Sequence, residues 1–357
     1  MTRPASNLVL LTGATGFIGF RILTELLERN HPVRAVVRSN EKGKWLLSRL
    51  RAVTGNEASL QHDVSFAVVD DFTADNAFDQ ALDGVSYVIH VAAPIASSDD
   101  PQDWERDFKQ AVVQSTVGLL ESARRSQSVR RIVMTSSISA IFPTSVFEEG
   151  SDTMLHAEMR NEEMIAPYRY QMLAYQAGKI ATLQSTESWI ATEKPTFDVI
   201  FLYTAFTIGR NDAVETKQQL TKFSSNWHCL QIILGHDCPR AKPLLTCHID
   251  DVAHCHVAAL DPKVSGNQGF LIASYTPHMQ WDDAKQFVLQ KYPKAVQRRI
   301  LPNDGHMSTS PVTIDVHKTE EAFDFKHIPY EAQVSDLVEQ YLELHDQEQD
   351  VQQMASL

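Results

Sequence analysis

Short, uninterrupted apolar runs alternate with segments of helical periodicity along the first half of the chain. Between the runs, apolar residues recur every three or four positions, as on one face of a helix. Continuous apolar runs are typical of strands in a parallel sheet that is covered on both faces. The pattern predicts strands at 7–12, 31–38, 64–70, 85–93 and 129–137, and helices at 16–30, 40–53, 74–83 and 102–126. This alternation predicts an α/β fold, a doubly wound parallel sheet.

The second half of the chain is less regular. It predicts a long helix at 170–191, a strand at 196–204, and a strand, turn and helix at 244–260. The remaining segments carry little periodicity. We therefore expect residues 1–204, with 244–260, to form the sheet domain, and residues 205–243 and 261–357 to form a smaller lobe.

Composition narrows the class of protein. The 357 residues are 43% hydrophobic and 22% charged, which is typical of a soluble globular protein. No apolar run reaches the roughly 18 residues of a membrane helix, and the N-terminus lacks the apolar segment of a signal peptide, so we expect a cytoplasmic protein. The net charge of −13 disfavours a nucleic-acid partner.

The four cysteines are expected to be free thiols. The stretch "CHIDDVAHCH" (247–256) brings cysteines and histidines close together in the sequence. It lacks the C-x-x-C spacing of zinc sites, and the apolar residues within it favour a strand that continues into a helix. We therefore expect no metal.

A glycine-rich turn follows the first strand, in "LLTGATGFIG". Glycines let the turn tighten and let backbone N–H groups approach a pyrophosphate, while the start of the next helix supplies partial positive charge. This strand–turn–helix context indicates a dinucleotide site in a Rossmann fold. The residues expected to hold the cofactor here are Gly13, Thr15, Gly16, Phe17, Ile18 and Gly19.

The end of the second strand indicates which cofactor is bound. An acidic residue there normally binds the ribose 2′-OH of NAD, but this chain has Arg38, with Lys42 close behind it. An arginine accommodates a 2′-phosphate instead. We therefore predict NADP(H).

The stretch "AYQAGKI" places Tyr175 four residues before Lys179. On a helix these side chains lie on one face, so the phenol and the ammonium can act at one place. The spacing is also common on ordinary helices and does not by itself establish catalysis.

A series of motifs that occur in a fixed order along the chain indicates a resemblance to a known family. The pieces "TGATGFIG", "RSNEK", "DDFTADNAFDQAL", "HVAAP", "RIVMTSSISAI", "YQAGK" and "HIDDVAHCHVAAL" run in order, followed by the tail "FDFKHIPYEAQVSDLVEQYLELH". The chain resembles the extended short-chain dehydrogenase/reductase family. Within that family it is similar to the branch of dihydroflavonol reductases, cinnamoyl-CoA reductases and fungal carbonyl (keto)reductases.

The resemblance implies roles for particular residues. Ser137, Tyr175 and Lys179 would be catalytic, and Tyr175 and Lys179 would also contact the cofactor. The residues that would contact the cofactor are Asp71 and Phe72 at the adenine, Ala92 and Ala93 after the fourth strand, and Tyr203 and Thr204 beside the nicotinamide.

The chemistry of carbonyl reduction suits these residue types. A ketone or aldehyde receives a hydride at carbon and a proton at oxygen. An ammonium beside a phenol stabilises the phenolate that remains after the proton is given up, and it can hold the nicotinamide ribose. A serine can position the carbonyl oxygen and stabilise its developing charge.

The chain departs from the branch at several positions. Gly178 replaces the usual serine, which we expect to be tolerated, and "YTA" (203–205) replaces an "NPG"-like turn. The segment before Tyr175 also differs, which indicates a changed substrate. Apolar and aromatic candidates for the substrate wall, suited to a bulky or aromatic ketone, are Ile138, Ile141, Phe142, Tyr170, Phe206 and the segment 221–236 with Trp227 and His228.

The leading hypothesis is an NADPH-dependent carbonyl reductase, by analogy a ketoreductase of secondary metabolism. One alternative is a non-redox epimerase or dehydratase with tightly bound cofactor. Another is a cofactor-sensing protein without catalysis. The sequence leaves open the substrate, the stereochemistry of the product, and whether the protein is a monomer or a homodimer.

Overall fold

The computed structural model describes residues 7–55, 63–93, 100–163, 166–222 and 224–355. The chain forms two compact units. Unit 1 comprises Met1–Thr144, Ala157–Tyr203 and Ala253–Phe270. Unit 2 comprises Ser145–His156, Thr204–Val252 and Leu271–Leu357.

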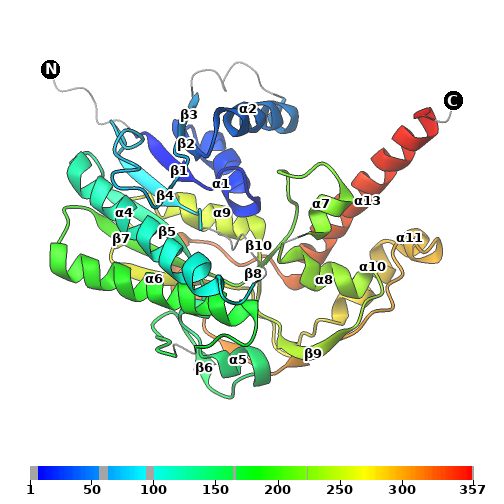
Figure 1. Cartoon of the computed structure of the whole chain (residues 1–357). Helices are drawn as coiled ribbons and strands as arrows, with labels where there is room; N and C mark the ends of the chain where they lie inside the picture. Colours follow the sequence, from blue (N-terminus) through cyan, green and yellow to red (C-terminus); the bar gives the residue numbers. More distant parts are fainter. Residues whose placement is uncertain (1–6, 56–62, 94–99, 164–165, 223, 356–357) are drawn as a thin grey trace. The chain divides into compact units, whose positions relative to one another are not determined.

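A seven-stranded sheet forms the centre of unit 1, in the order β11-β7-β5-β4-β1-β2-β3 (Figure 1). The pairs β1–β2, β2–β3, β1–β4 and β4–β5 are parallel. The strands are β1 (Val9–Thr12), β2 (Val33–Val37), β3 (Val64–Val68), β4 (Tyr87–His90), β5 (Arg131–Ser137), β7 (Asp198–Thr204) and β11 (Gln268–Ile272). The strand order reverses between β1 and β4, where doubly wound sheets bind their ligands. The predicted Rossmann-type sheet is confirmed.

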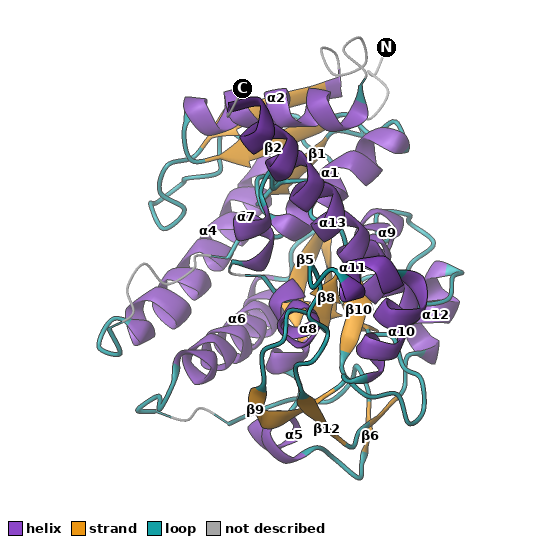
Figure 2. Cartoon of the chain, turned by 90° about the vertical axis from the view of Figure 1, so that its right-hand side faces the viewer, coloured by secondary structure: helices purple, strands orange, loops and turns teal. Residues whose placement is uncertain are grey.

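Helices lie on both faces of this sheet. In Figure 2, α4 and α6 lie on one side of the strands and α1 on the other. The helices of unit 1 are α1 (Phe17–Glu28), α2 (Asn40–Thr54), the π-helix η1 (Glu105–Gln110), α4 (Ala111–Ser126), the 3₁₀ turn η2 (Ile138–Ala140) and α6 (Gln171–Glu193). The apolar stripe of α1 is buried, including Ile22, Leu23 and Leu26, which explains its helical periodicity.

The prediction of a helix at 74–83 is wrong. The segment is a series of turns, and Asn76 has a left-handed backbone with φ 59°. A residue with that φ interrupts a right-handed helix. Phe78, Ala81 and Leu82 lie in these turns and are buried, and their spacing produces the apolar periodicity of the segment.

Unit 2 is built from short strands and helices. Its elements are α5 (Thr144–Glu149), β6 (Met154–Leu155), β8 (Phe206–Ile208), α7 (Lys217–Thr221), α8 (Asn226–Ile233), β9 (Cys238–Pro243), β10 (Thr246–His248), α10 (Asp283–Lys291), α11 (Pro293–Gln297), β12 (Met307–Ser310), β13 (Thr313–Ile314), α12 (His317–Phe323) and α13 (Tyr330–Ala355). The helix α9 (Ile249–Ala258) begins in unit 2 and ends in unit 1. The strands pair in parallel two by two, β8 with β10, β9 with β12, and β6 with β13.

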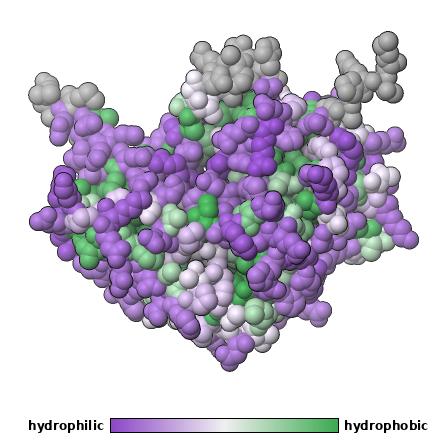
Figure 3. Space-filling model, turned by 180° about the vertical axis from the view of Figure 1, so that it is seen from behind, coloured by the Kyte–Doolittle hydropathy of each residue, from purple (hydrophilic) through white to green (hydrophobic). Residues whose placement is uncertain are grey.

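The core of unit 2 is aromatic and aliphatic. Trp281 is fully buried, and its ring meets that of Tyr330 edge-on at 5.8 Å between centroids. Leu230, Ile233 and Val334 pack into the same cluster. The face seen in Figure 3 is mostly hydrophilic, with separate apolar areas. None of the helices in the described part of the chain has the length and apolar character needed to cross a membrane.

Candidate functional site

The glycine turn after β1 is shaped by close backbone approaches. Gly13 has φ 76°, and a Cβ on it would lie 2.9 Å from the backbone nitrogen of Ala92. A Cβ on Gly19 would lie 2.0 Å from the carbonyl oxygen of Gly13. Gly16 is exposed and begins α1 without a side-chain cap. The first N–H groups of α1 therefore suit an anion, so the turn fits a pyrophosphate.

Thr12 and His90 join the ends of β1 and β4, a link that the sequence analysis missed. The hydroxyl oxygen of Thr12 accepts hydrogen bonds from the backbone N–H groups of Val91 and Ala92, both at 3.1 Å. The same oxygen lies 2.9 Å from Nδ1 of His90. Because the oxygen already accepts two bonds, its proton is the one donated to Nδ1. His90 is then neutral, with its proton on Nε2.

The electrostatics of His90 agree with this assignment. Burial and, to a smaller extent, the positive charge of Lys179 together lower the pKa of His90 to about 4. The electrostatic effect of Lys179 on His90 indicates that the Lys179 ammonium lies near the end of β4. Ala92 and Ala93 follow there and are half-buried beside the glycine turn.

Tyr175 and Lys179 lie one turn apart on α6, as predicted from their spacing. The Lys179 ammonium is 5.6 Å from the centroid of the Tyr175 ring. The ring of Tyr175 packs against a cluster formed by Trp104, Phe108 and Ala174. Both side chains are half-buried, so the phenol and the ammonium are held by packing while remaining accessible.

Ser137 ends β5 and begins η2. Its hydroxyl oxygen accepts a hydrogen bond from the backbone N–H of Ser139 at 3.1 Å, which fixes the side chain at the start of the turn. Its own proton remains for donation to another oxygen. η2 packs against α6, the helix that carries Tyr175 and Lys179. The three predicted catalytic residues thus lie in one unit, on elements that contact each other.

Gly178 has a structural role that the sequence did not reveal. A Cβ on this residue would lie 2.0 Å from the carbonyl oxygen of Phe108 in the π-helix η1. Single-turn π segments are frequent at functional sites. Here glycine lets α6 approach η1 closely, next to Tyr175. The sequence expectation was only that glycine would be tolerated where the branch has serine.

Replacing Gly178 by Ala should therefore destabilise the protein. The added methyl group forces α6 and η1 apart, and we expect a loss of about 1–3 kcal/mol in the free energy of unfolding, measured by urea denaturation. Gly118 in α4 is a matched control, since a Cβ there meets nothing closer than 4.0 Å. Gly118→Ala should be neutral or stabilise by about 0.5–1 kcal/mol. Equal effects at both positions would contradict the close-approach argument.

The other predicted cofactor residues lie at the ends of β2 and β3. Arg38 and Lys42 are exposed, and Ser39 between them caps α2 by accepting from the backbone N–H of Lys42 at 3.3 Å. Asp71 is exposed, and its carboxylate accepts two hydrogen bonds from Thr73, which lower its pKa. Phe72 meets Phe78 edge-on at 5.0 Å. Their contacts with a cofactor stay predictions.

The side chain of Tyr203, in β7, is fully buried. Its ring stacks on Phe201, and a Cβ on Gly269 would lie 2.2 Å from it. Burial raises the pKa of its phenol. The phenol of Tyr203 is therefore enclosed by its own unit, and contacts of Tyr203 and Thr204 with a nicotinamide stay predictions.

The predicted substrate residues fall in different environments. Ile138, Ile141 and Phe142 are buried in unit 1, where the carbonyl of Phe142 accepts from the side chains of Asn161 and Gln176. Tyr170 is half-buried just before α6.

The remaining candidates, Phe206, Trp227 and His228, belong to unit 2. The ring of Phe206 meets His228 edge-on at 4.5 Å. Nδ1 of His228 lies 3.1 Å from Nζ of Lys242, and burial lowers the pKa of His228 to about 3. His228 is therefore a neutral acceptor for the lysine.

The side chains of the cysteine- and histidine-rich stretch form hydrogen bonds within the protein. The thiol of Cys247 is buried 3.5 Å from the hydroxyl of Thr207, and His256 Nε2 lies 2.7 Å from the hydroxyl of Thr135. All four cysteines are free, as predicted. The described residues contain no group of three acidic, histidine or cysteine side chains placed to hold a metal ion.

Comparisons with known proteins agree with this geometry. The model of the "NAD dependent epimerase/dehydratase family" matches residues 9–273. "Ketoreductase CTB6" of Cercospora beticola is 56% identical, with 98% of each chain covered. "Ketoreductase sphI" of Aspergillus fumigatus is 30% identical, with 95% of this chain and 98% of the relative covered. The solved structure of Gre2 from Candida albicans in complex with NADPH has a TM-score of 0.77 at 22% identity, covering 95% of this chain and 99% of that one.

Proposed function

Because the chain belongs to the NAD dependent epimerase/dehydratase family, we propose that it is an NADPH-dependent carbonyl reductase that converts a ketone or aldehyde to an alcohol. One observation carries the proposal. Tyr175 and Lys179 share one face of α6, and the Lys179 charge acts on His90 at the end of β4, where the glycine turn lies. A relative that is 56% identical is called a ketoreductase, which supports the same activity.

The residues of the chain have separable tasks. The glycine turn and the start of α1 bind the pyrophosphate, and Arg38 with Lys42 binds the 2′-phosphate. When bound, NADPH supplies the hydride. The phenol of Tyr175 donates a proton to the carbonyl oxygen, and the Lys179 ammonium stabilises the phenolate that remains. Ser137 donates a hydrogen bond to the same oxygen and orients it. Thr12 and neutral His90 fix the backbone that follows β4 at Val91 and Ala92.

The finer features of the proposal rest on the resemblance and the composition. We propose a bulky or aromatic ketone as substrate, a role as a ketoreductase of secondary metabolism, and a cytoplasmic monomer or homodimer. The ketoreductase names of the relatives support the first two points.

The test follows the near-ultraviolet absorbance of NADPH while the protein is mixed with a panel of aromatic and polyketide-like ketones. Ketone-dependent loss of absorbance is the expected result. Tight binding of NADPH without consumption on any ketone or aldehyde would contradict the proposal.

An epimerase or dehydratase is the alternative, because the family description includes both. Such enzymes regenerate their cofactor in each turnover and keep it bound. Purified protein that carries NAD(H) and cycles it without net consumption would favour this alternative over the reductase.

Arg38→Ala should reduce the preference for NADPH over NADH. A charge-assisted contact with phosphate contributes about 1.5–3 kcal/mol, so the ratio of kcat/KM for the two cofactors should fall about 10- to 100-fold. Arg51, exposed in the last turn of α2, is the matched control and should leave the ratio unchanged when replaced by Ala. An unchanged ratio in Arg38→Ala would place the 2′-phosphate elsewhere.

A further inference from the structure

Unit 2 contains a cavity of about 410 Å³ that none of the predicted site residues lines. Its walls come from the segment 274–280 after β11, from the segment 309–313 that joins β12 to β13, and from Ser151 and Asp152 before β6. Leu244, Thr246 at the start of β10, and Tyr330 complete the wall. All of these residues belong to unit 2, so the cavity is a feature of that unit alone.

Three buried residues with hydroxyl side chains line the cavity. Thr246, Ser274 and Ser310 are 1%, 8% and 5% exposed. Within the described part of the chain, none of these hydroxyls has a hydrogen-bond partner in the protein, although the backbones of Thr246 and Ser274 bond to each other at 2.7 Å. None of the three oxygens is among the enclosed polar atoms that lack a partner, so they are accessible from the cavity. Three accessible hydroxyls around one cavity suit a polar occupant.

The walls are held rigidly by contacts outside the cavity. The N–H of Ser151 donates to the carbonyl of Pro311 at 2.8 Å. Gly150, with φ 92°, allows this approach, because a Cβ there would lie 2.4 Å from the same oxygen. The N–H of Trp281 donates to the Thr309 hydroxyl at 2.9 Å, and Tyr330 donates to the Trp281 carbonyl. The cavity is thus formed before any ligand arrives, which favours binding.

The charge of the lining excludes ionic ligands. It contains no lysine or arginine, and its carboxylate and imidazole, Asp152 and His278, are exposed at the rim. An anion would find no counter-charge, and a cation would find only the single rim carboxylate. Tyr275, Met279 and Val312 add apolar side chains to the lining. Apolar surface together with hydroxyls suits an aromatic ring that carries oxygen substituents.

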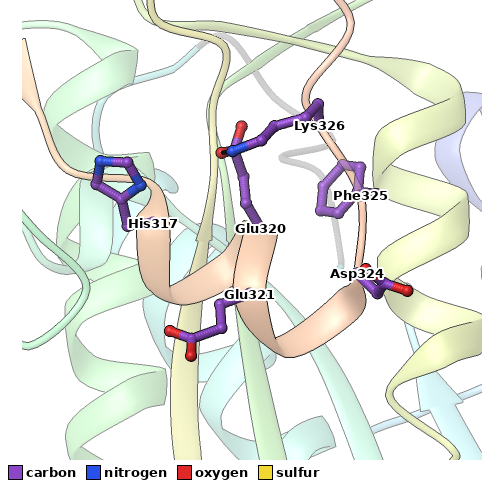
Figure 4. A pocket seen from close by; sticks show the side chains of 6 residues that line it. All are labelled: His317, Glu320, Glu321, Asp324, Phe325 and Lys326. Carbon is purple, nitrogen blue, oxygen red and sulfur yellow. Dashed lines mark hydrogen bonds and ion pairs between the residues drawn. The ribbon is translucent and has the colours of Figure 1, made fainter.

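A second cavity in unit 2, of about 390 Å³ beside α12, differs in these respects. Figure 4 shows Glu320 directed at Lys326, while His317, Glu321 and Asp324 point in separate directions. Its central polar groups are already paired with each other, since Glu320 also bonds His327. The Glu320–Lys326 pair at its centre therefore needs no ligand.

We propose that the cavity bounded by Thr246, Ser274 and Ser310 is a binding site for a neutral polyphenol of one or two rings. The phenolic hydroxyls hydrogen-bond the hydroxyls of these three residues, and the ring packs against Tyr275 and Met279. A cavity of this volume lies within the range that holds small organic ligands. The lining residues of this site are different from those of the proposed reductase site.

Calorimetric titration of the full chain with phloroglucinol, a neutral ring bearing three hydroxyls, tests the proposal. Saturable binding is expected, with none for trimesate, the tricarboxylate of the same geometry. Thr246→Val combined with Ser274→Ala removes two hydroxyls at nearly constant volume and should weaken binding about tenfold, as expected for two lost hydrogen bonds. Ser308→Ala, at an exposed position of β12 outside the cavity lining, is the matched control and should bind unchanged.

Three results would overturn the site. One is the absence of phloroglucinol binding, as for a cavity that holds only water. Another is equal affinity in the wild type and the double variant, with the fold of both confirmed by circular dichroism. The third is loss of phloroglucinol binding in Tyr175→Phe, which would move the ligand to the reductase site. If the double variant does not fold, Ser310→Ala takes its place, with a loss of about threefold expected for one hydrogen bond.

Discussion

Tyr175→Phe should reduce kcat for ketone reduction by about a hundred- to ten-thousandfold, the range expected for loss of a general acid. Phenylalanine keeps the ring that packs against Trp104 and Phe108 but removes the proton donor. The measurement is the steady-state consumption of NADPH with the best ketone of the panel. The affinity for NADPH, followed by fluorescence titration, should stay unchanged, because the hydroxyl is directed at substrate in the proposed mechanism.

Two companion variants sharpen this prediction. Tyr168 belongs to the same aromatic cluster, and its hydroxyl is hydrogen-bonded to Glu105. Tyr168→Phe should therefore retain most of the activity. Lys179→Met should lower both kcat and NADPH affinity, since the ammonium serves the phenolate and the ribose. Retention of a tenth or more of the wild-type kcat in Tyr175→Phe would remove the tyrosine from its role.

The sheet was predictable because most of its strands are buried on both faces. Val9, Leu10 and Leu11 are fully buried in β1, so the strand appears in the sequence as an unbroken apolar run. The glycine turn was predictable for a similar reason. Its function is carried by backbone conformation, and glycine at 13 and 19 is the only residue type that fits the observed approaches. At these positions the physical requirement, burial or a close backbone approach, acts on the residues themselves and is therefore visible in their sequence.

Contacts between distant positions were not predictable in this way. Thr12 meets His90 across 78 positions of sequence, and nothing near either residue marks the partner. The requirement for glycine at 178 likewise comes from Phe108 on another element. At 74–83 the apolar periodicity led to the wrong prediction of a helix, because buried residues in successive turns have the same spacing as the apolar face of a helix. A threonine just before the glycine turn is a signal that could have indicated the first of these contacts.

Unit 2 was the least predictable part. Its strands have two to six residues and pair with segments far along the chain, as β9 pairs with β12. Such short elements carry too few positions for a periodicity to be seen. The hydroxyls around its cavity are spaced along the sequence at 246, 274 and 310, and only the fold brings them together. Sequence patterns therefore identify the cofactor turn better than the cavity.

Arg131 is the residue whose loss should most reduce stability. It is 6% exposed in β5, and its guanidinium forms two hydrogen bonds with the Asp198 carboxylate, at 2.6 and 2.8 Å. It also donates to the carbonyls of Ala259, Asp261 and Val264 at 2.7–2.8 Å. One side chain thus ties β5 to β7 and to the segment after α9. A carboxylate and three carbonyls would lose their donor together.

Arg131→Met should lower the free energy of unfolding by about 3–5 kcal/mol, because a partly buried carboxylate and three carbonyls lose their donor at once. Urea denaturation measures it. The neighbouring Arg130 is exposed and lies over the Tyr87 ring at 4.8 Å, so Arg130→Met should cost less than about 1 kcal/mol. Combining Arg131→Met with Asp198→Asn should recover part of the loss, because the unpaired charge is removed. A loss below about 1 kcal/mol in Arg131→Met, equal to that in Arg130→Met, would mean that water replaces the guanidinium without cost.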